Sequence, residues 1–192
     1  QMAAFTATQL GALSTTQFLS LTTTQFVGMT STQIKGLTTT QIAVLTTTQL
    51  AGFNSTVLAA LTTTQIGGFN TTDMIALTTT QIGGLTSSQL GALTTTQVGV
   101  MTTTQIGVLS ATQVKGFTTL ELSVLTTTQF GALNSTQLGA LSTTQMTGLS
   151  TTDIAVMTTT QLGGLTSAQL AAFTTTQVGA VSTTDIAALK ST

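Results

Sequence analysis

The sequence predicts an all-α solenoid in which each repeating unit contributes one short, capped helix. Three features predict it: an eight-residue period along the whole chain, a hydroxyl or amide residue three places before a glutamine or acid, and apolar residues flanking that pair. A helix this short is unstable in water, so the stacking of neighbouring coils must supply the stability. We expect residues 1–192 to form one uninterrupted array that is a window of a longer chain.

The unit is numbered from its first apolar residue, which recurs at every eighth place from Phe5 to Leu189. Position 2 is Thr, Ser or Asn in every unit except the last, where it is Lys190, and position 4 is nearly always Thr. Position 6 is always apolar, position 8 is mostly Gly, Ala or Val, and position 7 varies most. Position 5 is Gln except at five places, which are Val57, Asp73, Glu121, Asp153 and Asp185.

Positions 2 and 5 predict where each helix begins. The pattern Ser/Thr-x-x-Gln/Glu is the capping box, in which the two side chains each accept a hydrogen bond from the other residue's backbone N–H. Position 2 admits the residues preferred at a helix N-cap, and the acids at position 5 suit the positive end of the helix dipole. Positions 1 and 6 then correspond to the apolar pair of a hydrophobic staple. The pattern therefore predicts a helix of about one and a half turns in every unit.

Two other architectures compete with this prediction. The Thr and Ile content favours a β-solenoid with threonine ladders, because β-branched residues suit strands. However, the large apolar residues are five and three places apart, and odd spacings place neighbours on opposite faces of a strand. A single continuous helix is disfavoured as well, since eight residues at about 100° each leave a drift of about 80° per unit. We therefore keep the β-solenoid as the alternative fold.

Helical spacing also predicts which positions are buried. Position 6 and the next position 1 are three residues apart and should form the core together. Phe5, Phe53, Met101 and Met146 occupy these two positions, so we expect them to be core residues. Positions 4 and 8 lie on another side, and their small or constant residues predict close packing there, against an adjacent coil or another chain. Lysine at position 7 predicts a solvated site. The pattern does not determine the number of units per coil.

The composition excludes several classes of function. The chain has 3 basic and 4 acidic residues, so it lacks the positive field that attracts nucleic acid or an anionic membrane. No segment predicts a membrane span, because polar residues interrupt the apolar ones in every unit and a spanning helix needs roughly 20 apolar residues. Cysteine and histidine are absent, which excludes disulfides and the usual zinc ligands.

We predict no catalytic residue, no metal ligand and no cofactor-binding residue. The titratable side chains are few and mostly far apart in the sequence: Lys35, Asp73, Lys115, Glu121, Asp153, Asp185 and Lys190. Catalysis requires several such groups to converge, and calcium requires several oxygen ligands from one loop. All four acids stand at position 5, so we interpret them as variants of the capping residue. The chain is therefore not expected to be an enzyme.

The threonines and glycines have structural interpretations. In each unit one Thr would cap the helix, the next would start it and the third would pack, although a regular hydroxyl array also suits ice binding, glycan binding or O-glycosylation. The pairs Gly67-Gly68, Gly83-Gly84 and Gly163-Gly164 lack the lysine of a phosphate-binding loop. We expect them to provide room for a close approach of two backbones.

A longer repeat of eighty residues, or ten units, overlies the octapeptide. Three polar residues recur at this distance, namely Lys35, Asn54 and Asp73 as Lys115, Asn134 and Asp153. We infer the duplication of a ten-unit block.

The unit Leu-Thr-Thr-Thr-Gln-Ile-Gly-Gly at Leu77–Gly84 resembles the octapeptide arrays of very large bacterial surface and secreted proteins of adhesin type. The resemblance covers the whole chain and implies an extracellular location. We therefore predict a structural protein, either a stiff spacer or a filament-forming segment of a surface fibre, that associates with its own copies. The alternative function is an ice- or glycan-binding β-solenoid.

Overall fold

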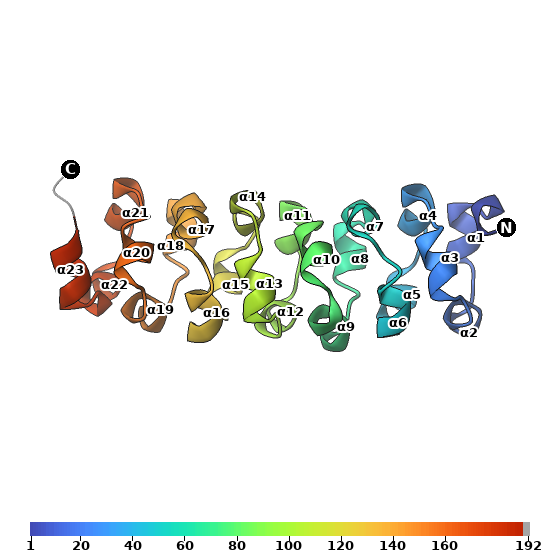
Figure 1. Cartoon of the computed structure of the whole chain (residues 1–192), viewed down its shortest axis with the longest axis horizontal. Coiled ribbons are helices and arrows are strands. Elements are labelled where there is room, and N and C mark those ends of the chain that lie inside the picture. Colours follow the sequence, from blue (N-terminus) through green and yellow to red (C-terminus); the bar gives the residue numbers. More distant parts are fainter. Residues whose placement is uncertain (190–192) are drawn as a thin grey trace.

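The computed structural model describes residues 1–189, which form an elongated rod of short helices (Figure 1). A 3-10 turn, Met2–Ala4, precedes 23 α-helices of four to six residues. The described residues contain no strand, so the alternative prediction of a β-solenoid is wrong. The helices are α1 (Ala7–Gly11), α2 (Thr15–Leu19), α3 (Thr23–Val27), α4 (Ser31–Lys35), α5 (Thr39–Ala43), α6 (Thr47–Leu50), α7 (Ser55–Ala60), α8 (Thr63–Ile66), α9 (Thr71–Ala76), α10 (Thr79–Gly83), α11 (Ser87–Leu90), α12 (Thr95–Gly99), α13 (Thr103–Gly107), α14 (Ala111–Val114), α15 (Thr119–Ser123), α16 (Thr127–Gly131), α17 (Ser135–Ala140), α18 (Thr143–Met146), α19 (Thr151–Ala155), α20 (Thr159–Leu162), α21 (Ser167–Ala171), α22 (Thr175–Ala180) and α23 (Thr183–Ala188).

Each α-helix begins directly after position 2, as predicted. The position-2 residue has extended backbone angles, and its side chain accepts a hydrogen bond from the backbone N–H of position 5. Both halves of the capping box are present in every helix from α1 to α22 except α7, which has Val57 at position 5. In α23 the Asp185 N–H donates to the Ser182 hydroxyl, but Asp185 accepts from that hydroxyl and not from the Ser182 backbone N–H.

Each helix ends one to three residues before the next unit starts. The backbone N–H of position 1 usually donates to the carbonyl of position 6, as from Leu37 to Ile34 over 3.1 Å. Position 1 is itself extended where it caps a helix, as at Leu141 with φ −63° and ψ 145°. Two extended residues, positions 1 and 2, thus join one helix to the next and set the angle between them.

The helices stack in coils of three. The helix pairs in substantial contact are all three apart along the chain, as α1 with α4 and α11 with α14 are, so one coil takes slightly more than three units. In Figure 1, α1, α4, α7 and α11 lie along the upper edge of the rod, and α2, α6, α9 and α12 lie along the lower edge. Because the step along an edge changes between three and four helices, the rows of helices wind slowly around the rod.

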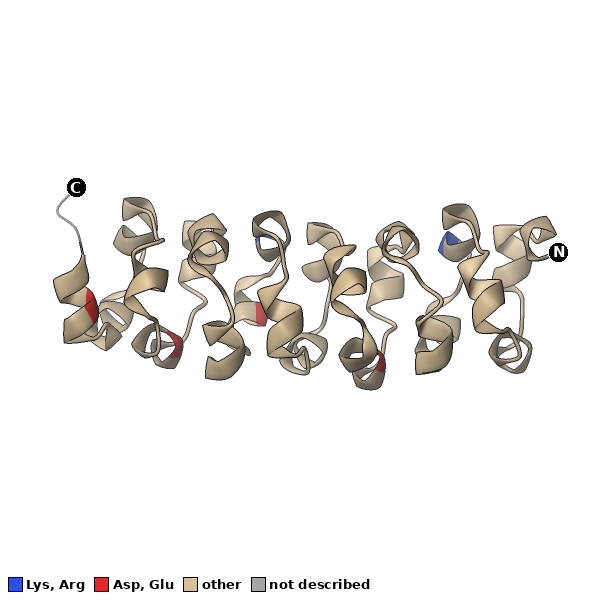
Figure 2. Cartoon of the chain, viewed as in Figure 1, with Lys and Arg blue, Asp and Glu red and all other residues tan. Residues whose placement is uncertain are grey.

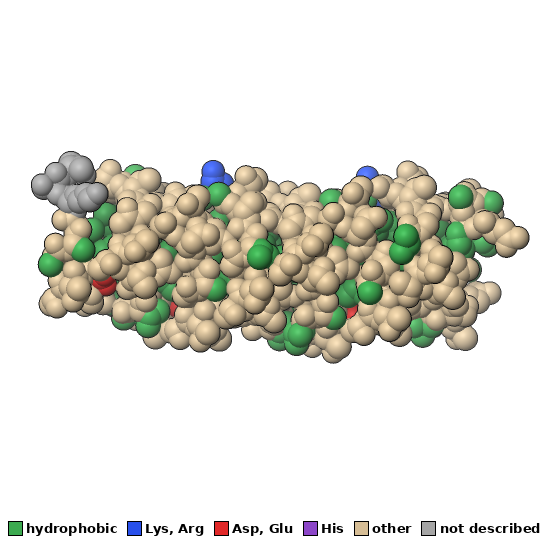
Figure 3. Space-filling model, in the orientation of Figure 1, with side chains coloured by type: hydrophobic (Ala, Val, Ile, Leu, Met, Phe, Trp, Pro, Cys, Tyr) green, Lys and Arg blue, Asp and Glu red, His purple; other side chains and the backbone are tan. Residues whose placement is uncertain are grey.

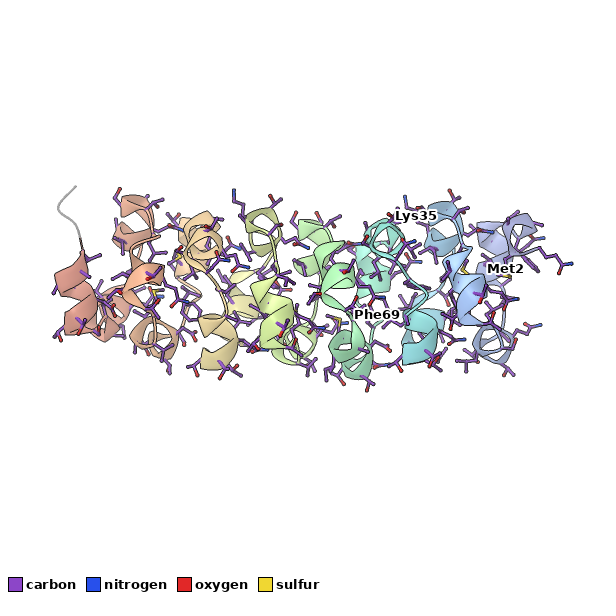
Figure 4. The ribbon with its side chains drawn as sticks, viewed as in Figure 1. Met2, Lys35 and Phe69 are labelled. Atoms are coloured by element: carbon purple, nitrogen blue, oxygen red, sulfur yellow. The ribbon has the colours of Figure 1, made fainter. Side chains whose placement is uncertain are left out.

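A continuous apolar core runs along the inside of the rod. Positions 6 and 1 are buried in nearly every coil, which confirms the predicted core, and Phe53, Met101 and Met146 belong to it. Phe5, which the pattern predicts to be buried, is 43% exposed, because no coil of the described residues covers it. In Figure 4 the Phe69 side chain lies within the rod, whereas Lys35 lies near its outer edge, as predicted for position 7.

Position 4 does not pack against neighbouring coils in residues 1–189, so the prediction that it packs against an adjacent coil is wrong. The threonines at position 4 are exposed in every described unit, and Leu120 at the same position is 64% exposed. The side chains at position 4 face solvent, and adjacent coils meet instead at positions 3, 5, 7 and 8. The third threonine of each triplet is therefore a surface residue.

Glycine at position 8 allows the predicted close approach between backbones. A Cβ atom added to Gly84 would lie 2.5 Å from the Ser55 Cβ, and one added to Gly164 would lie 2.5 Å from the Ser135 Cβ. The position-7 glycine of each pair is not packed against another coil. A Cβ added to Gly83 meets nothing within 4 Å, and the atoms nearest to one added to Gly67 or Gly163 are carbonyl oxygens of the same helix. No described glycine has a positive φ, so glycine at position 8 supplies space and not an unusual backbone conformation.

The substitution Gly116→Ala tests this close approach. The added Cβ would lie 2.0 Å from the Ser87 carbonyl oxygen, so the two coils must separate, and we expect a loss of about 1–3 kcal/mol of unfolding free energy. The matched control is Gly99→Ala, whose Cβ meets no atom within 4 Å and whose helix propensity should improve stability by up to about 1 kcal/mol. Urea denaturation measures both changes, and a stabilised Gly116→Ala variant would contradict the proposed packing.

Candidate functional site

The buried glutamines at position 5 form the chemically most distinctive feature of the rod. Every described glutamine at this position from the second coil onward has a relative exposure of 6% or less. Burial of an amide side chain is costly unless its donors and acceptor are satisfied. The hydrogen bonds of this side chain are therefore needed to offset the cost of its burial.

Gln105 shows the geometry shared by these residues. Its Oε1 accepts a hydrogen bond from the Thr102 backbone N–H over 2.8 Å, and its own N–H donates to Thr102 Oγ1 over 3.1 Å. Its Nε2 donates to the Met74 carbonyl over 2.9 Å and to the Leu77 carbonyl over 2.7 Å. One side chain therefore caps its own helix and binds the preceding coil.

The same bridge recurs along the rod. In 15 described glutamines Nε2 donates to a carbonyl 31 or 28 residues earlier. Gln33 begins the series by donating to the Met2 carbonyl over 2.9 Å. Met2 is labelled in Figure 4 near one end of the rod. Gln9, Gln17 and Gln25 lie in the first coil, and their Nε2 atoms reach no carbonyl of the described residues.

Sequence reasoning predicted the capping half of this bridge and missed the half that joins two coils. A signal for it was present, because the chain has one glutamate and many glutamines at position 5. A capping box accepts Glu as well as Gln, and the helix dipole favours Glu. The strong preference for Gln therefore indicates a donor requirement that capping alone does not explain.

The four acids occupy the buried places predicted for them. Asp73, Glu121, Asp153 and Asp185 are at most 5% exposed, and the first three complete the capping box of their helices. Burial raises the pKa of Asp73, and the hydrogen bond from the Asn70 backbone opposes this rise. The capping interpretation of these acids is confirmed for α9, α15 and α19.

The charged residues do not converge into one site (Figure 2). Lys35 ends α4 and Lys115 follows α14, and both helices lie along the upper edge of the rod. Asp73 and Asp153 lie in α9 and α19 along the lower edge. Ten units thus return the chain to the same side, so the eighty-residue repeat preserves the face on which each charge lies. Lys190 is outside the described residues.

Other binding features are sparse within residues 1–189. These residues contain no group of three or more acidic side chains placed to hold a metal ion. None of the described helices has the length and hydrophobicity that crossing a lipid bilayer requires. A shallow groove between two coils is lined by Lys115, Thr118, Ser142 and Thr144, among others. Figure 3 shows a surface composed mainly of uncharged polar side chains and backbone, with scattered apolar side chains.

Val57 offers a direct test of the bridge, because it interrupts the glutamine series. The equivalent carbonyls, 31 and 28 residues earlier, belong to Phe26 and Met29, and a glutamine would also accept from the Asn54 backbone N–H. We expect Val57→Gln to stabilise the rod by about 1–2 kcal/mol through these added hydrogen bonds. Thermal unfolding followed by circular dichroism measures the gain. The control Val57→Leu adds length without an amide, and an equal gain in both variants would contradict the bridge.

Comparison with known families identifies the repeat. A family model described as the ALTTAQ repeat matches residues 69–103, 87–119, 146–183 and 154–191. These overlapping matches together cover about half of the chain. No curated protein matches the sequence. The chain belongs to the ALTTAQ repeat family.

Proposed function

Since the chain belongs to the ALTTAQ repeat family, a family of tandem repeats, we propose that it is a non-enzymatic structural rod. In this proposal it serves as a stiff extracellular spacer or as a filament-forming segment of a surface fibre. The main supporting observation is the recurring bridge from the interior glutamines to the preceding coil, as from Gln81 to the Leu50 and Phe53 carbonyls. When every coil binds its neighbour in the same way, length grows with the number of units.

The composition and the resemblance of the repeat unit support the location. The octapeptide resembles the arrays of bacterial surface and secreted proteins, and a rod that holds another domain away from a cell must be long and free of large loops. Residues 1–189 contain no insertion between units. The low charge leaves little electrostatic repulsion between neighbouring rods and favours self-association.

The spacer proposal predicts a length that depends only on the number of units. Variants with blocks of three units added or removed would be compared by small-angle X-ray scattering and negative-stain microscopy. We expect the particle length to change in proportion to the unit number while the cross-section stays constant. Compact particles whose dimensions do not follow the unit number would refute the proposal.

A second candidate function is glycan attachment or glycan binding. The observation that favours it is the exposed threonine at position 4 of nearly every unit, which presents a free hydroxyl at regular intervals around the rod. Mass spectrometry of the secreted protein would detect O-linked sugars, and a glycan array would detect binding. Absence of both O-linked sugars and glycan binding would contradict this second candidate function.

A further inference from the structure

Glu121 is the one glutamate of the chain, and it occupies a place where glutamine normally donates a hydrogen bond. It is 2% exposed. Its Oε2 accepts a hydrogen bond from the Thr118 backbone N–H, as the Oε1 of a capping glutamine does. Its Oε1 is buried and has no hydrogen-bond partner among the described residues. This free oxygen corresponds to the Nε2 atom that joins the coils elsewhere.

The surroundings of this oxygen follow from the repeat. The neighbouring glutamines donate 31 and 28 residues back, as Gln113 does to the Ile82 and Leu85 carbonyls over 2.9 and 2.8 Å. For Glu121 the corresponding carbonyls are those of Leu90 and Leu93. A carboxylate in this place would set a negative oxygen against two carbonyl oxygens in a buried site, which is strongly unfavourable.

We propose that Glu121 holds a proton in the folded rod and donates it in a hydrogen bond to the carbonyl of Leu90 or Leu93. A protonated carboxyl group is nearly isosteric with the glutamine amide and restores the missing donor. The proton comes from solvent, and its loss leaves the carboxylate opposite the same two carbonyls. The hydrogen bond between these coils therefore forms at acidic pH, and the contact weakens as the pH rises.

The electrostatic surroundings agree with this assignment. Burial raises the pKa of Glu121, and the hydrogen bonds from the backbone and side chain of Thr118 oppose the rise. Helices α12 and α18 pack against α15, and neither contains a titratable residue; the same is true of α11 and α16. Lys115, which follows α14, is the one charged residue of the adjacent helices in the described part of the chain, and it is exposed.

The aspartates at the same position are less suited to this role. Asp153 also has one buried oxygen without a partner, Oδ1, but its side chain is one methylene shorter than that of Glu121. Its Oδ2 is bound by both the Ser150 backbone N–H and the Ser150 hydroxyl, over 3.1 and 2.6 Å. Glu121 is therefore the acid whose length matches the glutamine bridge.

The sign of the pH dependence follows from linkage. An acid whose pKa is raised on folding contributes its full stability below the ordinary pKa of glutamate and loses it as the pH rises through the raised pKa. We expect the substitution Glu121→Gln to raise the melting temperature at neutral pH, because the amide donates at every pH. The difference in melting temperature between the two proteins should disappear in mildly acidic solution. The aspartates are present in both proteins and therefore do not affect this difference.

Two further measurements separate titration from a purely structural effect. The side-chain carboxyl carbon of Glu121, assignable because the chain has one glutamate, should titrate in NMR spectra above the ordinary range of glutamate. The substitution Gln105→Glu should create a second site with the same pH dependence, whereas Gln9→Glu in the exposed first coil should not. An ordinary titration of Glu121, or a stability difference that is the same at every pH, would overturn the proposal.

Discussion

Replacing Gln105 by leucine is expected to destabilise the rod by about 3–5 kcal/mol. The substitution leaves the Thr102 N–H and the Met74 and Leu77 carbonyls without their partner in a buried place. Each buried polar group left unpaired costs about 1–3 kcal/mol, and part of this cost is recovered as the coils relax. Urea denaturation measures the loss, and hydrogen exchange at the Thr102 N–H locates it.

The matched control for this substitution is Gln9→Leu. Gln9 forms the same capping box with Thr6, but it is exposed and its Nε2 reaches no earlier coil of the described residues. Only the cap is lost there, so we expect a cost of about 1 kcal/mol or less. Equal losses in the two variants would mean that the bond between coils contributes nothing to stability.

The substitution Phe26→Ala tests the packing of the core. We expect it to lower the free energy of unfolding by about 3–5 kcal/mol. Phe26 is fully buried and its ring lies between those of Phe18 and Phe53, with centroids 5.3 and 5.4 Å away. The ring of Phe26 meets that of Phe18 edge to face, at an interplanar angle of 81°, which is a favourable arrangement for aromatic pairs.

The adjacent residue provides the control for the core. Val27 is 57% exposed at position 7 of the same helix, and Val27→Ala should change stability by less than about 0.5 kcal/mol. Denaturation monitored by circular dichroism compares the two variants at equal concentration. A Phe26→Ala variant as stable as Val27→Ala would contradict the location of the core.

The beginning of each helix and the core could be predicted from the sequence because both depend on local spacing. A hydroxyl or amide at position 2 and an acceptor at position 5 specify an N-cap independently of how the coils stack, as at Thr94 and Gln97. The next apolar residue, Val98, is then one turn along and must share a side with Met101. These relations span fewer than eight residues and repeat in every unit.

The stacking of the coils could not be predicted from the same spacing. The number of units per coil depends on the summed backbone angles of the extended residues between helices, and no residue pattern reports that sum. Without it, the predicted packing of position 4 against an adjacent coil was wrong, and the partners of Gln105 at Met74 and Leu77 were unknown. The preference for glutamine over glutamate at position 5 was the sequence feature that indicated the hydrogen bond between coils.

For the position-5 acids too, contacts within one unit were predictable and contacts with the preceding coil were not. Capping explains why Asp73 and Asp153 are tolerated, since either carboxylate accepts from its N-cap backbone. Their burial, and the unpaired oxygen of Asp153, depend on the preceding coil and became visible only in the stacked structure. Sequence reasoning therefore identified these residues but not the cost of placing them there.

Exchange of the glutamine side-chain amide protons, followed by NMR, tests the glutamine bridge most directly. If each interior Nε2 donates to the preceding coil, the amide protons of Gln81, Gln89 and Gln105 will exchange slowly with solvent. Those of Gln9 and Gln17 will exchange at the rate of a solvated amide. Uniformly rapid exchange along the whole rod would show that the glutamines cap their own helices without joining the coils.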